Sequence, residues 1–282
     1  MPELPEVEII KRRLEEILPN KVIDQVTVLR KKSFQGNISQ VLNKKFLKIS
    51  RRAKLLRIHL SDNLNLLIHL KMTGQLIYQD DEIRLGGGHP TADWVNTLPS
   101  SHTRIIFKFS DGSHLFFNDM RVFGWIRVLT DSQVEIEFAK LGPDANDRLF
   151  TAEYLKNWIH SRRIPIKQAI MLNEVVTGIG NIYAAEALFQ AGIDPRRPAN
   201  SLNMNELKKL VINIKKVLDE GIKHKGTTFD GKYVDLSGMS GEHQHYLKVY
   251  GRTGEECVSC GSKLSSVKIA GRGTVFCEKC QN

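Results

Sequence analysis

Apolar side chains recur at a helical interval near the start of the chain. Pro5 favours a helix start there, because the first helical turn leaves its N–H groups unpaired and proline has none to lose. Glutamates in the same stretch suit the positive end of the helix dipole. The spacing predicts an amphipathic helix from Pro5 to about Leu18. Its apolar face consists of Val7, Ile10, Leu14, Ile17 and Leu18.

From Val22 to about Leu129 the pattern is typical of β-strands. The runs FLKISRRAKLLRIHL and NLNLLIHLKMTGQLIY are joined by a natural turn, Ser61-Asp62-Asn63. A second hairpin is predicted around Asp111-Gly112, in TRIIFKFSDGSHLFFND. This half of the chain therefore predicts an antiparallel sandwich or barrel that carries the N-terminal helix.

The second half begins with a break in the pattern and then favours helices. Gly142-Pro143, in AKLGPDANDRLF, indicates a linker. Further on, NELKKLVINIKKVLDE places its apolar residues on one helical face. Residues 223–244 are rich in Gly, Ser and Asp and show no periodicity, which predicts a mobile loop.

Between the linker and that long helix lies a glycine-rich turn, in GIGNIYAAEALFQAG. We expect Asn181 to be the N-cap of a helix that runs to about Ala191 and is followed by Gly192. A turn of this kind at a helix start exposes backbone N–H groups that can hold a phosphate.

All cysteines of the chain lie near its end, as two Cys-x-x-Cys pairs. This spacing is typical of a closed tetrahedral zinc site, whereas the alternative of two disulfides needs an oxidising compartment. With four thiolates and no open position, the expected Zn²⁺ ion is structural. Between the pairs, VKIAGRGTVF predicts a hairpin with Gly271-Arg272-Gly273 at its tip. The four predicted ligands are Cys257, Cys260, Cys277 and Cys280.

Charge indicates the class of partner. The 282 residues carry a net charge of +10, with a pI near 9.4, and a basic protein favours polyanions such as nucleic acid. The stretch from Gln25 to Ser61 holds many basic residues and no acidic one, as expected of an electrostatic footprint for DNA.

Other protein classes fit the sequence less well. No apolar run approaches the roughly 20 residues of a membrane span. The acidic N-terminus lacks the layout of a signal peptide, so we expect a cytoplasmic protein associated with the nucleoid. Nothing in the sequence indicates an obligate protein partner, and we expect a monomer.

In their order, these segments resemble the formamidopyrimidine-DNA glycosylase family of bifunctional base-excision enzymes. The resemblance covers nearly the whole chain and rests on eight motifs: PELPEVE, RRAK, HLKMTG, NDMRVFG, LGPD, GIGNIYAAEALF, VYGRTGEEC and GRGTVFCEKCQ.

The resemblance implies an α+β protein of several domains. Its parts would be an N-terminal antiparallel β-sandwich with a leading helix, a central helix-two-turn-helix bundle, and a C-terminal four-cysteine zinc β-hairpin. The corresponding ranges are a catalytic domain over 1–135, a DNA-binding domain over 136–225, a mobile lesion-recognition loop over 226–244, and a zinc finger over 245–282.

It also implies a chemistry for the opening residues. Removal of the initiator Met leaves Pro2 as a free secondary amine, which would attack C1′ of an oxidised purine nucleotide such as 8-oxoguanine or a formamidopyrimidine. The resulting Schiff base would allow β- and δ-elimination at the abasic site. Glu3 would shuttle protons, Lys54 would donate a proton in β-elimination, and Arg272 would grip a phosphate and serve in δ-elimination.

The partner implied is double-stranded DNA that contains oxidised bases or abasic sites. His102, Arg121 and Arg163 match family positions that contact DNA, and Asn181 matches the phosphate-binding turn. The lesion nucleotide must leave the base stack, and Met72, Arg121 and Phe123 match the trio that fills the hole.

The sequence departs from the family in three places. Val122 stands where many relatives carry a second arginine, and Met120 replaces a common proline. The stretch GGGHPTADWVNTLPSS, before His102, and the 226–244 loop also match poorly. These differences bear on lesion range and on the reading of the opposite strand.

Two alternatives stay open. An endonuclease VIII-type glycosylase would prefer oxidised pyrimidines, although PELPEVE and the long loop after Gly226 favour the purine-directed enzyme. A non-catalytic zinc-ribbon DNA-binding protein would bind DNA without forming a covalent intermediate, and it would not need Pro2, Glu3 and Lys54 together.

Overall fold

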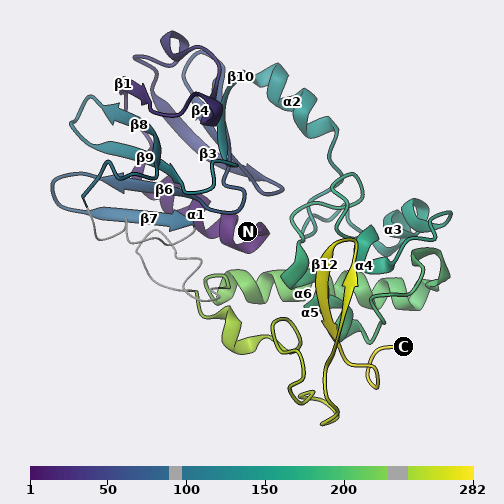
Figure 1. Cartoon of the computed structure of the whole chain (residues 1–282). Helices are drawn as coiled ribbons and strands as arrows, with labels where there is room; N and C mark the ends of the chain where they lie inside the picture. Colours follow the sequence, from purple (N-terminus) through teal and green to yellow (C-terminus); the bar gives the residue numbers. More distant parts are fainter. Residues whose placement is uncertain (89–96, 228–240) are drawn as a thin grey trace. The chain divides into compact units, whose positions relative to one another are not determined.

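The computed structural model describes residues 1–88, 97–227 and 241–282, and these form two compact units (Figure 1). The first unit comprises Met1–Ala139 with His224–Gln244, and the second comprises Lys140–Lys223 with His245–Asn282. The loop expected over 226–244 and the unusual stretch before His102 fall largely on residues 228–240 and 89–96, which lie outside the described residues.

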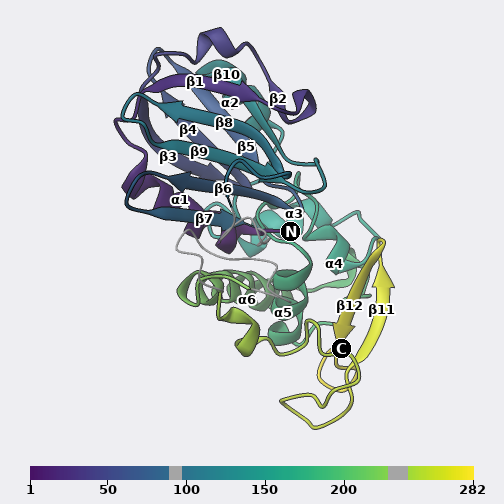
Figure 2. The same cartoon turned by 60° about the vertical axis from the view of Figure 1, so that its left-hand side comes forward.

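In the first unit, two sheets lie face to face (Figure 2). One has the strand order β1-β8-β9-β6-β7 and the other β2-β10-β5-β4-β3. All pairings are antiparallel except the short one between β10 and β2. The elements are α1 (Leu4–Ile17), β1 (Ile23–Val28), η1 (Lys31–Ser33), β2 (Phe34–Gln35), η2 (Ile38–Gln40), β3 (Phe46–Arg52), β4 (Leu55–Leu60), β5 (Leu64–His69), β6 (Gly74–Gln79), β7 (Arg84–Gly88), β8 (Thr103–Phe109), β9 (His114–Asp119), β10 (Trp125–Thr130) and α2 (Asp131–Ala139).

A single apolar core joins both sheets to α1. Leu14 of the helix, Ile58 of one sheet and Phe117 of the other are fully buried members of it. The core confirms a sandwich, and both predicted turns are present. Asp62 takes a left-handed backbone conformation with φ 60°, and Gly112 does so with φ 87°.

Two helices differ from the prediction. Helix α1 begins at Leu4 and not at Pro5, because Glu3 is its N-cap and Pro5 occupies the second helical position. Helix α2 was not predicted, since it has no apolar face: Val134 is its one buried residue, while Ile136 is exposed.

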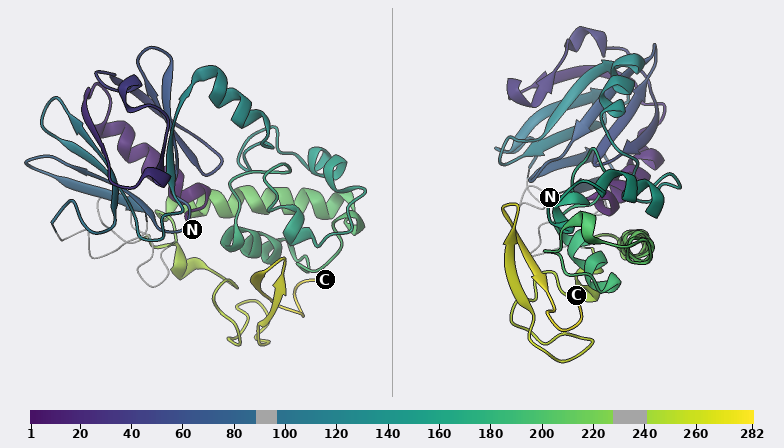
Figure 3. Two further views of the ribbon diagram at one scale, coloured as in Figure 1. Left: turned by 45° about the horizontal axis from the view of Figure 1, so that its top comes forward. Right: turned by 90° about the vertical axis from the view of Figure 1, so that its right-hand side faces the viewer.

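The second unit combines helices with the C-terminal hairpin, and Figure 3 shows α6 nearly end-on in its right-hand view. The long predicted helix is present, and Gly192 ends α5 in a left-handed conformation with φ 73°. Strand β12 packs against α5. The elements are α3 (Ala152–Ile159), α4 (Ile166–Ala169), α5 (Asn181–Ala191), η4 (Ala199–Ser201), α6 (Met204–Lys223), β11 (Ser265–Ile269) and β12 (Arg272–Phe276), with η5 (His243–Tyr246) at the boundary of the units.

The predicted C-terminal hairpin forms, but its turn lies earlier in the chain than the predicted tip. Ile269 pairs with Arg272, so the turn consists of Ala270 and Gly271, both left-handed with φ 47° and 78°. Arg272 is therefore the first residue of β12, where its side chain is exposed.

A buried carboxylate of α5 holds the segment that leads to this hairpin. Glu186 is 2% exposed, and its two oxygens accept hydrogen bonds from the backbone N–H groups of Lys248, Val249 and Tyr250 at 2.8–2.9 Å. Burial raises the pKa of Glu186, while these three hydrogen bonds act in the opposite direction.

The architecture confirms the α+β fold class, with N-terminal sheets, a helical region and a C-terminal four-cysteine hairpin. Within the three described ranges, no helix combines the length and the apolar character that crossing a membrane requires.

Replacing Glu186 by Ala should destabilise the second unit, because three backbone N–H groups lose a charged acceptor. We expect its free energy of unfolding to fall by about 3 kcal/mol. Calorimetric unfolding of the variant and the parent measures this. Glu220→Ala is the matched control, since the Glu220 side chain on α6 is 38% exposed and lies 4.0 Å from Lys216 Nζ, a weak surface ion pair. Equal losses in both variants would contradict the role of Glu186.

Candidate active site and nucleic-acid interface

The N-terminal residues are fixed by a buried carboxylate. Pro2 is buried, and Glu3 is 3% exposed. The Glu3 N–H donates to Glu6 Oε2 at 2.8 Å, while Glu6 Oε1 accepts from the N–H of Thr227 at 2.9 Å. The start of the chain is thereby held beside the first residues of the 224–244 segment, inside the first unit.

A second link joins α1 to the turn that carries Lys54. Ala53 and Lys54 connect β3 to β4, and Ala53 is left-handed with φ 58°. Arg51 binds both sides of the link: it donates to the carbonyl of Ala53 at 2.8 Å and to Glu8 of α1 at 3.0 Å. Burial would raise the pKa of Glu8, but the hydrogen bonds from Arg51 and Arg12 outweigh it and lower that pKa. The geometry ties the helix that begins just after Pro2 to the Lys54 turn.

Met72 and Phe123 are large apolar side chains that lie on neighbouring turns and are exposed. Their exposed fractions are 41% and 48%. The Arg121 guanidinium lies over the Phe123 ring, 4.9 Å from its centroid. His102 belongs to the same end of the sheet, because its carbonyl accepts from the N–H of Asp119 at 2.9 Å.

In the second unit, the side chain of Asn181 does not cap α5. Gly180 is the N-cap, which corrects the prediction, and Asn181 is the first helical residue. Its amide oxygen instead accepts from Lys167 Nζ at 2.7 Å, and its amide nitrogen donates to the carbonyl of Gly273 at 3.0 Å. Lys167, 1% exposed, also donates to Thr274 Oγ1 at 2.9 Å. These bonds place the glycine-rich turn beside Arg272.

Arg163 lies in the same unit, on the exposed connection between α3 and α4. Within the described residues, its side chain makes no hydrogen bond to Asn181 or Arg272. Its assignment as a DNA contact stays a prediction.

The four cysteines come together as a group that fits a tetrahedral metal site. Their sulfur atoms all lie within 4.8 Å of one another. The Cys257–Cys280 and Cys260–Cys277 sulfur distances are 3.9 and 3.5 Å, and no disulfide joins them. Four thiolates about 2.3 Å from one zinc ion would be spaced by about 3.8 Å.

The basic run of the first unit is partly neutralised by distant acids. Arg57 pairs with Asp131 at 2.6 Å and with Glu135 at 2.9 Å, and Lys44 pairs with Asp62. Together with Arg51, at least three of the ten basic residues between Gln25 and Ser61 therefore make ion pairs within the described part of the chain.

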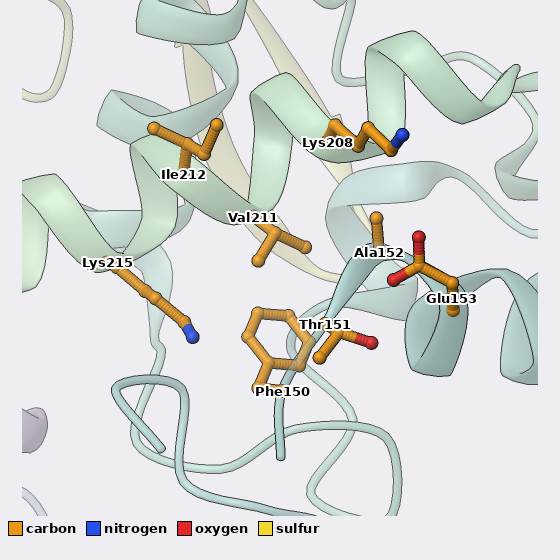
Figure 4. Close-up of a pocket in the computed structure, with 8 residues that line it drawn as sticks. All are labelled: Phe150, Thr151, Ala152, Glu153, Lys208, Val211, Ile212 and Lys215. Atoms are coloured by element: carbon orange, nitrogen blue, oxygen red, sulfur yellow. The ribbon is translucent and has the colours of Figure 1, made fainter. Parts of the chain in front are cut away.

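A pocket of about 320 Å³ lies apart from all predicted site residues, between α3 and α6 of the second unit (Figure 4). Phe150 and Val211 form apolar walls, with lysines of α6 at the rim, and Lys215 already donates to the carbonyl of Asp147 at 2.9 Å. The pocket brings together no catalytic set of side chains. Its lining consists of Phe150, Thr151, Ala152, Glu153, Lys208, Val211, Ile212 and Lys215.

Comparison with known proteins accounts for both units. Residues 1–126 match the N-terminal domain of formamidopyrimidine-DNA glycosylase, residues 141–232 its H2TH domain, and residues 254–282 the zinc finger found in this enzyme and in IleRS. The chain belongs to the formamidopyrimidine-DNA glycosylase family. The resemblance, the DNA-repair glycosylase class and the zinc-finger assignment are therefore confirmed.

Individual relatives extend over the full chain. The formamidopyrimidine-DNA glycosylase of Desulforamulus reducens is 40% identical over 100% of this chain and 99% of its own length. A mutant of the Lactococcus lactis enzyme, solved with DNA containing Fapy-dG, has a TM-score of 0.88 at 30% identity and full coverage of both chains. The wild-type Lactococcus lactis enzyme, solved with DNA containing an oxidised pyrimidine, has a TM-score of 0.86 at 30% identity and full coverage of both chains.

The sequence analysis missed several residues that hold the candidate site and its surroundings in place in this structure. They are buried polar groups whose partners are distant in sequence, so no local spacing marks them. Lys167, for example, reads as one more cation of a basic chain. The missed residues are Glu6, Glu8, Arg51, Thr73, Asp119, Lys167, Glu186 and Thr274.

One histidine should make the Met72 turn sensitive to acid. Burial, with the Lys71 and Lys54 cations, lowers the pKa of His69 from 6.5 to about 3. His69 Nδ1 also accepts from the N–H of Lys71 at 3.0 Å, a bond that protonation would break. As the pH falls below about 6.5, His69 becomes protonated in the unfolded chain but stays neutral in the folded protein. The contribution of His69 to the free energy of unfolding is therefore fully present above that pH and is lost progressively as the pH falls to about 3.

We expect His69 to account for about 1–2 kcal/mol of the unfolding free energy lost between pH 7 and 5. His69→Asn keeps an acceptor near the Nδ1 position and cannot be protonated there, so its stability should depend less on pH. Urea midpoints at the two pH values measure the difference. His160→Asn is the control, because His160 is the exposed residue that follows α3 as its C-cap. The same pH dependence in parent and His69→Asn would show that His69 does not carry the effect.

Proposed function

We propose that this protein excises oxidised purines from duplex DNA through the amine of Pro2 and then cuts the strand by β,δ-elimination. The observation that carries the proposal is the attachment of α1, which begins just after Pro2, to the Lys54 turn through Arg51 and Glu8. It brings an amine-bearing terminus and a lysine turn into one unit of a chain that belongs to the glycosylase family over its full length.

The first step would be attack of the Pro2 nitrogen on C1′. An α-amino group has a pKa of about 8, so a useful fraction is unprotonated near neutral pH. The new N–C1′ bond replaces the bond to the base, which leaves with a proton. Opening of the sugar ring, with protonation of O4′, then gives the imine. The Glu3 carboxyl is the nearest acid in sequence and is held in place as the N-cap of α1.

Strand cleavage follows from the imine, which acidifies the neighbouring C2′ proton. Loss of that proton expels the 3′-phosphate, and a second elimination expels the 5′-phosphate, leaving a one-nucleotide gap. Lys54, 8% exposed, would serve the first elimination and Arg272 the second. Phosphate groups suit the exposed guanidinium of Arg272 and the nearby glycine-rich turn before α5.

Extrusion of the damaged nucleotide requires side chains that enter the base stack. Met72 and Phe123 are exposed apolar groups on adjacent turns, and Arg121 stacks on Phe123. We assign these three to filling the vacated space. His102, Arg163 and Asn181 would bind the DNA backbone, where most protein–DNA hydrogen bonds are made.

The zinc finger would hold one structural Zn²⁺ through Cys257, Cys260, Cys277 and Cys280. Bound there, the ion supplies folding energy and no reaction chemistry, because four thiolates leave no open coordination position. The buried cysteines Cys257 and Cys277 also belong to an apolar cluster with Ala185 and Phe189 of α5. The hairpin that presents Arg272 is thereby packed on the helix that follows the glycine-rich turn.

An endonuclease VIII-like preference for oxidised pyrimidines is the second candidate. A structure related to this chain is the Lactococcus lactis enzyme bound to DNA with an oxidised pyrimidine, so the fold does not restrict the lesion to purines. Single-turnover excision from matched duplexes with 8-oxoguanine or thymine glycol separates the two. Faster release of thymine glycol would favour the second candidate.

Blocking the N-terminus should abolish catalysis without abolishing DNA binding. An N-terminal extension converts the Pro2 amine to an amide, whose lone pair is delocalised and cannot attack C1′. We expect no base release and no borohydride-trapped complex on a duplex with 8-oxoguanine opposite cytosine. Binding to a stable abasic-site analogue should persist. A C-terminally tagged protein is the control and should succeed in all three assays.

Two results would contradict this assignment. Trapping by the extended protein would identify another amine, with Lys54 the first to test. Failure of the C-terminally tagged protein to trap, despite tight binding, would support a non-catalytic DNA-binding protein.

Removing the metal should disable incision while leaving most of the fold. Cys257→Ala deletes one ligand and should lower incision below detection, with little change in far-UV helicity, because the larger cores lie elsewhere. Val258→Ala is the matched control, since Val258 is in the same knuckle but is 59% exposed. Incision and bound zinc are measured together. Native incision by metal-free protein would refute the structural role.

A further inference from the structure

The turn that carries Met72 and the turn that carries Arg121 and Phe123 share one buried side chain. Asp119 is the last residue of β9 and is fully buried. Its backbone is held on both sides, since its N–H donates to the carbonyl of His102 at 2.9 Å and its carbonyl accepts from Arg104 Nε at 2.8 Å. The carboxylate therefore has a fixed position between the two turns.

The Asp119 oxygens bind both turns at once. Oδ2 accepts from the N–H of Gly124 at 2.6 Å, and Oδ1 accepts from the N–H of Arg121 at 3.2 Å. Oδ1 also accepts from the hydroxyl of Thr73, the residue after Met72. The Thr73 oxygen in turn accepts from the Arg121 N–H at 3.0 Å.

Both turns contain backbone conformations that need such support. Val122, between Arg121 and Phe123, has φ 56°, which is a genuine outlier for a β-branched residue. Lys71, just before Met72, has φ 53°. Strain of this kind persists only where surrounding contacts hold it, and it is typical of functional sites.

We infer that Asp119 is a positioning residue that joins the Met72 turn and the Arg121–Phe123 turn into one rigid wedge through Thr73. The inference rests on the proposed function, because the wedge acts when a base is extruded. Side chains that enter a base stack are pushed back by the bases that they separate. Two turns joined by hydrogen bonds to one carboxylate keep their geometry against this force, whereas two separate turns would be displaced by it.

The hydroxyl of Thr73 allows the junction to be cut without touching the wedge side chains. Thr73→Val has the same shape and lacks the hydroxyl, and Thr73→Ser keeps it. We expect Thr73→Val to slow single-turnover excision of 8-oxoguanine roughly tenfold, the effect of one lost hydrogen bond to a charged group. Thr73→Ser should stay close to the parent.

A substrate without a base separates positioning from general damage to the fold. On a duplex with a preformed abasic site no base has to be unpaired, so Thr73→Val should change strand cutting by less than about twofold. In a Phe123→Ala background the wedge is already lost, and Thr73→Val should add little to the defect. Equal losses on both substrates, or full additivity with Phe123→Ala, would overturn the inference.

Hydrogen exchange tests the junction without activity. In both Thr73→Val and Asp119→Asn, the backbone N–H of Arg121 should exchange faster than in the parent. In Asp119→Asn, the backbone N–H of Gly124 should also exchange faster. Unchanged exchange at both amides would overturn the inference even if the glycosylase proposal holds. An inactive parent with these exchange changes would overturn the proposed function and leave the junction supported.

Discussion

Backbone N–H groups that are buried outside helices and sheets must find an acceptor, and three carboxylates supply one in this protein. Glu6 accepts from the start of the chain and from Thr227, Asp119 accepts within the turn after β9, and Glu186 accepts from three successive residues before the zinc hairpin. In each case an irregular segment has one defined shape because a charged group within the fold dictates it. Two of these segments, the start of the chain and the turn after β9, carry residues of the proposed site.

The features that the sequence predicts well are those with a local cause. The sandwich follows from alternating apolar residues and turn chemistry, and the metal cluster follows from the spacing of four cysteines. Asp119 escapes prediction because its partner Thr73 is 46 residues away and nothing near either residue marks the pair. The role of Asn181 as a helix cap was also mispredicted because its bonding partners are distant in sequence. Its residue type favours a cap, but Lys167 and Gly273 claim its side chain, so the glycine before it caps the helix.

Charge behaves similarly. A stretch without acidic residues looks like an open cationic surface when only neighbours along the chain are considered. In the fold, Arg57 meets Asp131 from 74 residues away, and Arg51 meets Glu8 from 43 residues away. These two cations form ion pairs that hold the first unit together. Part of the positive charge that the composition suggests for DNA binding is therefore neutralised within the protein. Net charge predicts the class of partner, while the assignment of single cations to phosphates depends on the tertiary structure.

The clasp of Glu186 on residues 248–250 has a consequence for biosynthesis. Those residues precede Cys257, and their bonds to α5 involve no metal ligand. These bonds need no metal, so they can form as soon as the helical region of a newly made chain has folded. An ion that binds the four cysteines afterwards closes a loop whose start is already attached to α5, which lowers the entropy cost of closing that loop.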